Sequence, residues 1–252
     1  MAKKLKAMVI MQNQLRVVFV VISVTKKKYY LKGYIKFTDG GMLIMPTREE
    51  WLKERMSGIG GSDAAAIIGL NPYKSNVDLW KEKVGLVKAK DISDKSYVQY
   101  GIAMEDILRK SFAVKHPEFE VLHEENTIIR HPKYPFLFAS LDGTLVKKET
   151  GEAGVLEIKT SEILRSMQKE KWKDGVPQNY YCQVLHYLNV TGYGFAYLFA
   201  ELTYSNDIQT NKTYEFDAEK LKDEMNYLEK KEIEFWKYVE MKKEPPLLLP
   251  NI

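Results

Sequence analysis

The feature of this sequence that most constrains its fold is a change of hydrophobic period near residue 119. Apolar residues from Tyr97 to Phe112 recur at the spacing of one helix face, which predicts a helix over 97–115. After them, short alternating or apolar stretches bounded by turn residues predict β-strands over 119–129, 136–146 and 154–160. A chain that combines both periods in this way is typical of a helix-covered sheet.

Capping residues and apolar runs predict the remaining elements. The expected helices are one that begins after Thr47, then 64–68, 77–84, 161–173, 177–188 and 218–241, and the expected further strands are 193–201 and 214–216. The order of helices, strand meander, helix, strand and helix predicts an α/β core with a mixed sheet flanked by helices.

The formal net charge of +4 is unevenly distributed. Residues 1–44 hold nine Lys or Arg and one Asp, whereas residues 45–252 hold 29 basic and 33 acidic residues. The basic excess therefore belongs to the N-terminal segment, and the net charge alone is no evidence for nucleic-acid binding.

We expect residues 1–44 to be a basic extension and residues 45–252 to form one domain, since this length favours a single core. Within the extension, 17–24 and 29–37 are predicted strands added to the edge of the domain. The apolar run 17–24 is too short to cross a membrane as a helix and lacks a signal-peptide cleavage site. Codons for Asp39 to Met42 can form a purine-rich tract like a ribosome-binding site, so we expect translation to begin at Met45.

Asp142 and the triplet Glu157-Ile158-Lys159 are the strongest candidates for chemistry. Alternation along a strand puts Glu157 and Lys159 on one face, and Asp142 lies on the preceding strand of the same hairpin. Close carboxylates repel unless a divalent cation lies between them, and a nearby lysine stabilises charge that develops on a phosphate. The alternative interpretation is a plain turn at Asp142 and a solvated strand face.

Two helical residues are candidates for the same pocket. Glu105 lies at the edge of the apolar face of its helix, and Gln183 is next to an inward-facing valine on a later helix. The alternatives are an exposed helix glutamate and a polar boundary residue.

The glycine-rich stretch 58–63 is a candidate anion site. Backbone amides at a helix start and the hydroxyl of Ser62 donate to anions, and Arg55 lies close enough in sequence to bind the same phosphate. Neither a Walker loop nor a dinucleotide fingerprint fits, so the alternative is a simple helix cap formed by Ser62 or Asp63.

Other polar residues give weaker signals. The single cysteine, Cys182, excludes a disulfide framework and a cysteine-ligated zinc or iron–sulfur site, and it fits a reducing, cytoplasmic setting. Lys169 to Lys173 form a basic run that is either a solvated face or a contact for a phosphate backbone.

Several motifs together resemble the lambda-exonuclease-like, YqaJ-type viral recombinases of phage recombination. The resemblance runs from about Trp51 to Phe199, and its elements occur in the family's order: Arg55 with Gly58–Asp63, Gly69–Tyr73, Leu79-Trp80, Gly101 with Glu105, Ser140–Gly143, Leu156–Thr160 and Gln183–Tyr187. One departure is Ser140-Leu141, where a proline usually precedes the catalytic aspartate.

The resemblance implies the restriction-endonuclease-like, PD-(D/E)xK fold and a set of residue roles. Asp142 and Glu157 would bind divalent metal, with Glu105 and the carbonyl of Ile158 completing the coordination. Lys159 would position the attacking water, and Gln183 would orient Lys159 or the scissile phosphate. Arg55 and Ser62 match positions that hold a 5′-terminal phosphate. The implied cofactor is Mg²⁺, with Mn²⁺ as a substitute, in a one- or two-metal site.

The implied activity is 5′→3′ exonuclease action on double-stranded DNA ends in the cytoplasm of a bacterial host. A homotrimer and a single-strand annealing protein are the implied partners, with no membrane involved. Two alternatives stay open: a DNA endonuclease of the same fold, and a DNA-binding recombination factor that no longer cleaves.

Overall fold

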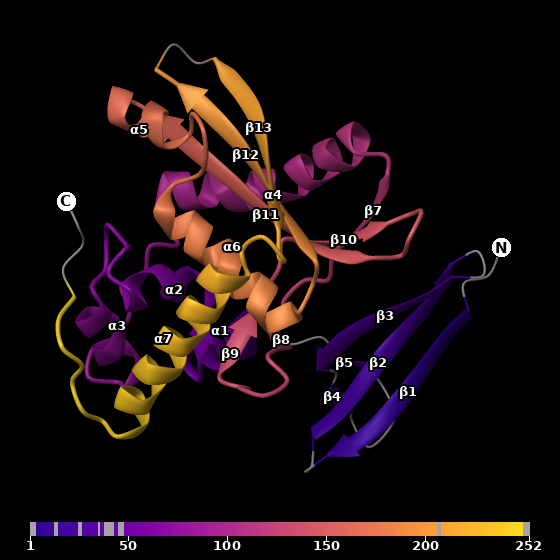
Figure 1. The fold of residues 1–252 in the computed structure, drawn as a ribbon, viewed down its shortest axis with the longest axis horizontal. Helices are drawn as coiled ribbons and strands as arrows, with labels where there is room; N and C mark the ends of the chain where they lie inside the picture. The colour runs from indigo at the N-terminus through magenta and orange to yellow at the C-terminus, as the bar shows by residue number, and fades with distance from the viewer. Residues whose placement is uncertain are drawn as a thin grey trace.

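A computed structural model describes residues 4–12, 15–24, 27–34, 36–37, 43–44, 48–205 and 208–248 (Figure 1). The strands are β1 Lys4–Gln12, β2 Leu15–Val24, β3 Lys27–Tyr34, β4 Lys36–Phe37, β5 Leu43–Ile44, β6 Ile59–Gly60, β7 Phe119–Leu122, β8 Ile129–Arg130, β9 Leu137–Ala139, β10 Gly143–Lys147, β11 Ala153–Ile163, β12 Phe195–Tyr204 and β13 Gln209–Asp217. The helices are α1 Arg48–Met56, α2 Gly61–Ile67, α3 Asn76–Lys83, α4 Ser96–Lys115, α5 Ser166–Lys171, α6 Gln178–Thr191 and α7 Lys222–Glu240.

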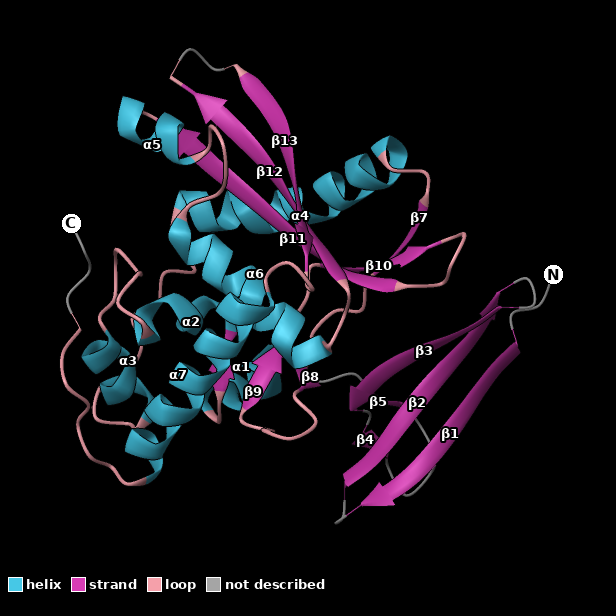
Figure 2. Cartoon of the chain, viewed as in Figure 1, coloured by secondary structure: helices cyan, strands magenta, loops and turns pink. Residues whose placement is uncertain are grey.

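Five strands form the central sheet, in the order β13-β12-β11-β10-β7. β11 and β12 are parallel and the other neighbours are antiparallel, so the sheet is mixed, as predicted. Helices α4 and α6 cover its two faces in the middle (Figure 2). Leu156 and Ile158 of β11 therefore pack with Phe112 of α4, while Val155 belongs to the buried cluster that includes Val184 of α6.

A second group of elements packs beside α6. Helices α2, α3 and α7 contact one another there, and β6, β9 and β8 form a small sheet in which Gly60 pairs with Phe138 (Figure 1). This arrangement brings the start of the glycine-rich stretch close to the strand that leads to Asp142.

Two predicted strands are wrong in extent. Residues 119–129 divide into β7 and β8, which belong to different sheets, because Asn126 between them adopts a left-handed backbone with φ 57°. Residues 136–146 divide into β9 and β10, with Asp142 at the break immediately before β10. There the Asp142 side chain, and not a strand carbonyl, accepts the Ile158 N–H.

The predicted helix 161–173 and the predicted short strand 214–216 are also wrong in extent. β11 continues to Ile163 because it pairs with β12 as far as Tyr204, so the helix shortens to α5. Pairing with β12 likewise extends the second strand to the whole of β13. In both cases the sheet ladder overrides local helix or turn preference.

Two helix starts differ from the prediction. α2 begins at Gly61, and Asp63 is its third residue rather than its cap; the Asp63 side chain accepts the Gly60 N–H at 3.2 Å. α7 begins at Lys222 instead of 218. Gly192 has φ 68°, which ends α6 as predicted. The predicted cap at Thr47 and the start at Met45 lie outside the described residues.

The strands near the N-terminus form a sheet of their own. β2 pairs antiparallel with β1 and with β3, so these three described strands form a sheet separate from the central one. The predicted strands over 17–24 and 29–37 form as β2 and as β3 with β4, whereas β1 was not predicted. Their addition to the edge of the domain stays a prediction. The division into a basic extension and one domain stays a prediction.

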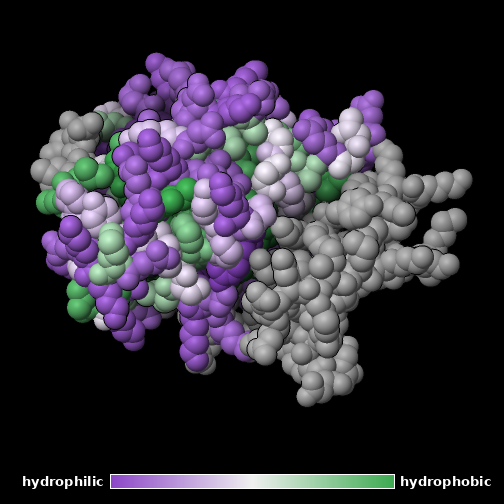
Figure 3. All heavy atoms as spheres, turned by 60° about the horizontal axis from the view of Figure 1, so that its bottom comes forward, coloured by the Kyte–Doolittle hydropathy of each residue, from purple (hydrophilic) through white to green (hydrophobic). Residues whose placement is uncertain are grey.

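The described surface is largely polar on the face drawn in Figure 3, where apolar residues appear as small patches among hydrophilic ones. In the part of the chain that the structure describes, every helix is too short or too polar to cross a bilayer.

Candidate active site

β11 carries the central pair of candidate residues. Strand alternation puts Glu157 and Lys159 on the face that α6 covers, as predicted from the sequence. Glu157 is only 1% exposed, whereas the Lys159 side chain is 20% exposed. The Lys159 ammonium donates to Glu157 Oε1 at 2.5 Å, so a buried carboxylate lies against a cation that still reaches solvent.

Asp142 lies in the break between β9 and β10. Its Oδ2 accepts the backbone N–H of Ile158 at 2.8 Å, which places the carboxylate beside the strand residue between Glu157 and Lys159. The register of the hairpin, in which Gly143 pairs with Leu156, places Asp142 next to Glu157 as predicted, and the bond to Ile158 orients its carboxylate.

Gln183 extends from α6 to the same carboxylate. Its Nε2 donates to Glu157 Oε1 at 2.6 Å and to the hydroxyl of Tyr187 at 2.9 Å. Because both protons of the amide are used, the Tyr187 hydroxyl helps to fix which end of the amide faces Glu157. The family resemblance implies that Gln183 orients Lys159 or the scissile phosphate, whereas in the structure its side chain contacts Glu157.

Glu105 lies on α4 and is paired with a residue that the sequence analysis missed. Arg109 donates through its terminal nitrogen to Glu105 Oε1 at 2.7 Å and through Nε to the carbonyl of Asp142 at 2.7 Å. The i,i+4 spacing of Arg109 from Glu105 is the sequence signal that could have indicated this ion pair. Arg109 thereby connects α4 to the break that holds Asp142.

Burial and the close approach of several carboxylates determine the pKa values in this site. Burial, reinforced by the Asp142 charge, raises the pKa of Glu157 to about 8. Burial also raises the pKa values of Asp142 and Glu105. Burial by itself lowers the pKa of Lys159, but the Glu157 and Asp142 carboxylates raise it by more, so Lys159 is a firm cation.

The donor set fits a divalent cation. Glu157 Oε2 is buried and, among the described residues, has no hydrogen-bond partner. A buried carboxylate oxygen beside a second carboxylate is a hard donor that Mg²⁺ prefers. No group of three carboxylate, imidazole or thiol side chains in the described ranges converges as a complete ligand set. Glu105 is engaged by Arg109 and Asp142 by Ile158.

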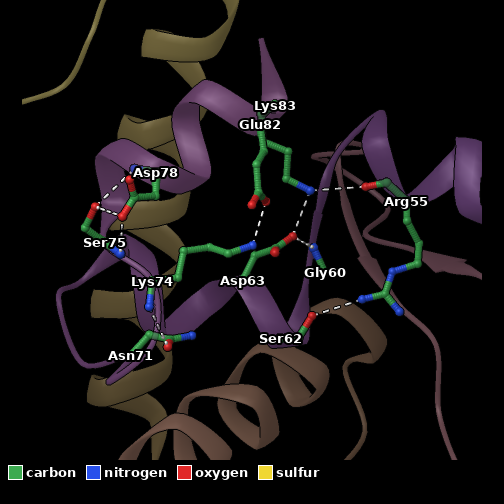
Figure 4. A network of polar contacts seen from close by, with 10 residues as sticks. All are labelled: Arg55, Gly60, Ser62, Asp63, Asn71, Lys74, Ser75, Asp78, Glu82 and Lys83. Carbon is green, nitrogen blue, oxygen red and sulfur yellow. Dashed lines mark hydrogen bonds and ion pairs between the residues drawn. The ribbon is translucent and has the colours of Figure 1, made fainter. Parts of the chain in front are cut away.

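The glycine-rich stretch brings the two candidate phosphate ligands together. Arg55, near the end of α1, donates to Ser62 Oγ at 3.0 Å, and its guanidinium lies 4.6 Å from the centre of the Trp51 ring. Figure 4 shows the support beneath them: Lys83 of α3 donates to Asp63 at 2.8 Å and to the carbonyl of Arg55 at 3.1 Å. Sequence reasoning missed Lys83, which lies 20 positions from Asp63 and gives no local signal.

This stretch also packs directly on α6. A Cβ added to Gly61 would lie 2.5 Å from the Tyr187 ring and 2.9 Å from Gln183, so only glycine allows this approach. The Arg55–Ser62 pair and the Glu157 site are therefore joined through one layer of side chains.

The weaker candidates lie apart from this site. Cys182 is a buried free thiol, and His186 is buried against Glu232 of α7. The basic run Lys169–Lys173 lies on and just after α5, with Trp172 buried inside it.

The fold and the carboxylate–lysine strand define a restriction-endonuclease-like α/β domain, which confirms the predicted fold class. The crystal structure of an alkaline exonuclease (LHK-Exo) from Laribacter hongkongensis superposes with a TM-score of 0.56 and 19% identity over 77% of this chain and 93% of that chain. LHK-Exo in complex with dAMP gives 0.57 and 20% over the same shares. At this identity the likeness establishes the fold.

The profile of the YqaJ-like viral recombinase domain matches residues 50–194, and the chain belongs to this family. "Uncharacterized protein YqaJ" of Bacillus subtilis (strain 168) is 37% identical over 193 residues, which cover 75% of this chain. The matched region spans 56% of the length of that relative.

Proposed function

We propose that this chain is a metal-dependent deoxyribonuclease that degrades one strand of duplex DNA from its 5′ end and leaves a 3′ single strand for recombination. The observation that carries the proposal is the buried Oε2 of Glu157, which lies beside Asp142 and Lys159 and has no hydrogen-bond partner in the described part of the chain. The family and the exonuclease-like fold support the same activity.

Asp142 and Glu157 are the residues proposed to hold Mg²⁺ or Mn²⁺, with Glu105 and the carbonyl of Ile158 as further ligands. When bound, such an ion lowers the pKa of a coordinated water and neutralises charge on the phosphate that is cleaved. Either one or two ions are compatible with this donor set.

Lys159 and Gln183 act on the reacting groups in different ways. The Lys159 ammonium, partly exposed beside Glu157, donates to the attacking water and stabilises negative charge that develops on the scissile phosphate. Gln183 holds the Glu157 carboxylate in orientation through its 2.6 Å bond. Arg109 performs a similar task for Asp142 and Glu105.

Arg55 and Ser62 are proposed to bind the 5′-terminal phosphate. An arginine fork and a hydroxyl match the geometry of a phosphate monoester, and their packing on α6 through Gly61 puts the strand end close to Glu157. We also propose a homotrimer and a single-strand annealing partner, which light scattering and a pull-down with a purified annealing protein test.

The deciding experiment compares linear duplexes with closed circular DNA, each with Mg²⁺ or with EDTA. We expect linear duplex to lose 5′ nucleotides only with Mg²⁺, while closed circles stay intact. Cleavage of closed circles would establish an endonuclease instead. Well-folded protein that binds DNA but cleaves neither substrate would establish a binding factor.

The Arg55→Ala variant tests the end-binding site. Loss of a charged hydrogen bond should reduce cleavage of 5′-phosphorylated ends by roughly 10- to 100-fold. Cleavage of 5′-hydroxyl ends should change little, and initial rates on the two matched duplexes measure this. An equal loss on both ends would contradict the assigned role.

A further inference from the structure

A shallow groove of about 580 Å³ is lined by residues from the end of β11, from α5 and from the end of the β12–β13 hairpin. Figure 1 shows where these elements lie in the fold. Arg165 and Lys169 line one side, and Tyr204 and Ile208 line the other. The groove includes none of the residues assigned above to metal or to the 5′ phosphate, so it is a separate surface.

The segment that forms one wall is fixed at both of its ends. At its start, Gln168 Oε1 accepts the backbone N–H groups of Leu164 and Arg165, each at 3.0 Å. At its end, Trp172 is buried, and its carbonyl accepts from Tyr214 and Lys212, each at 2.5 Å. The side chains between these points are therefore presented on a fixed backbone.

Apolar side chains that line the groove are exposed to water on both of its sides. Leu164 is 64% exposed and Ile208 across the groove is 53% exposed. Buried residues are absent from α5 altogether. Neighbouring apolar side chains held out by a fastened segment are typical of a surface that contacts a ligand.

The groove is also locally basic. Arg165 and Lys169 belong to its lining, which contains no carboxylate among the described residues. Residues 45–252 carry 29 basic against 33 acidic residues, so this local excess runs against the balance of the domain. A polyanion would therefore favour this surface.

A chain of contacts connects the groove to the candidate active site. The Lys159 ammonium lies 5.0 Å from the centre of the Tyr180 ring, and that ring lies 5.6 Å from Trp172, which anchors the end of α5. Arg165 is six residues beyond Lys159 on the same stretch of chain. A DNA strand that passes the active site can thus reach the groove within about 20 Å.

We propose that this groove binds single-stranded DNA through cation–phosphate and apolar–base contacts. Unstacked bases offer faces to Leu164, Tyr204 and Ile208, while Arg165 and Lys169 pair with phosphates. Duplex DNA hides its base faces, so it would contact only the two cations and gain nothing from the apolar side chains. The choice of DNA rests on the proposed function, and the groove's task would be to hold the single strand that digestion leaves.

Binding is measured without cleavage, in EDTA, by fluorescence polarisation of a labelled oligothymidine of about 16 nucleotides and of a blunt hairpin duplex. The Arg165→Ala/Lys169→Ala variant should bind the oligothymidine at least about tenfold more weakly. Its salt slope between about 50 and 200 mM should fall by about 1.4, the value for two lost phosphate contacts. Leu164→Ser/Ile208→Ser should weaken binding with no change of salt slope.

The control is Lys230→Ala/Lys237→Ala, which removes the same charge from exposed positions of α7 and should leave oligothymidine binding unchanged. Thermal unfolding checks that each variant folds. Wild-type affinity in the groove variants, or an equal loss in the control, would overturn the proposal. An equal loss for the hairpin would overturn the preference for single strands. If the protein binds oligothymidine through the groove but cleaves no DNA, the proposed nuclease activity fails while this inference stands.

Discussion

At the scale of single residues, Glu157 combines two properties that conflict in a metal-free protein. It is almost fully buried, and its Oε1 accepts from both Lys159 and Gln183, which favours the charged form. Burial and Asp142 nevertheless raise its pKa to about 8, and Oε2 stays without a partner among the described residues. A divalent cation between the two carboxylates would remove this conflict, because it would supply the missing positive charge.

Glu157→Gln tests that role, since the amide keeps the size and one acceptor of glutamate but loses the charge. Hydrolysis of duplex DNA should fall roughly 1,000-fold or more, with duplex binding in EDTA unchanged. Mg²⁺ at 100 times its Kd should stabilise the wild type by about 2.7 kcal/mol and the variant hardly at all. Thermal unfolding with and without Mg²⁺ measures the difference. Equal stabilisation of both proteins would place the ion elsewhere.

At the scale of elements, an ion pair between α2 and α3 supports the candidate phosphate ligands (Figure 4). Lys83 is 5% exposed, and it joins Asp63 to the carbonyl of Arg55. Burial raises the pKa of Asp63, but the Lys83 ammonium, the Gly60 N–H and the Arg55 charge together lower it by more, so the carboxylate is charged. Lys74 and Glu82 form a second ion pair nearby, at 2.6 Å, in which the lysine side chain is 33% exposed. This pair does not contact the glycine-rich stretch 58–63.

Lys83→Met should therefore cost far more than Lys74→Met. Removal of one partner from a buried pair leaves an uncompensated charge and costs about 3 kcal/mol, whereas a surface pair contributes less than about 1 kcal/mol. Urea unfolding measures both changes. The additional Asp63→Asn substitution should recover part of the stability lost in Lys83→Met, and equal destabilisation by the two lysine variants would contradict the argument.

The local sequence pattern predicted which helices and strands form better than it predicted where each one begins and ends. The helical period found α4, and strand alternation placed Glu157 and Lys159 on one face, because both signals lie within a few residues. Ser140, Asp142 and Gly143 interrupt the apolar residues between Phe136 and Val146, and they indicated a turn at Asp142 only as the alternative interpretation, because the geometry of the break depends on a bond to Ile158, 16 residues away. Pairing with β12 similarly extended β11 past the point where its sequence favours a helix.

At the scale of the whole molecule, a buried pair connects the C-terminal helix to the candidate site. His186 donates through Nε2 to the carbonyl of Phe138 at 2.8 Å, because a carbonyl only accepts. Its Nδ1 lies 2.7 Å from Glu232 of α7, and since the Glu232 charge raises the pKa of His186, we expect the histidine to carry both protons and a charge. Glu232 lies beyond residue 194, where the family match ends, and 46 residues from His186, so no sequence pattern indicated this contact.

The His186–Glu232 pair predicts that part of the free energy of unfolding depends on pH. Burial alone lowers the pKa of His186, but Glu232 raises it above its usual value, with a smaller contribution from Asp63. A raised histidine pKa stabilises the fold fully below the unfolded value near 6.5, and this stabilisation is lost as the pH rises through the folded-state pKa. The Glu232 charge also raises the pKa of nearby His131, against the stronger effect of burial, so Glu232→Gln changes the titration of His131 in the same direction as that of His186.

The Glu232→Gln variant should be less stable than wild type by roughly 2 kcal/mol at pH 6, and this deficit should shrink by pH 9. Urea unfolding at the two pH values measures both differences. Glu234→Gln is the matched control, because Glu234 pairs with Lys231 at the surface of the same helix, and its effect should be small at both pH values. A deficit for Glu232→Gln that is constant from pH 6 to pH 9 would mean that His186 is uncharged in the folded protein, and that α7 is held to α6 by packing and neutral hydrogen bonds alone.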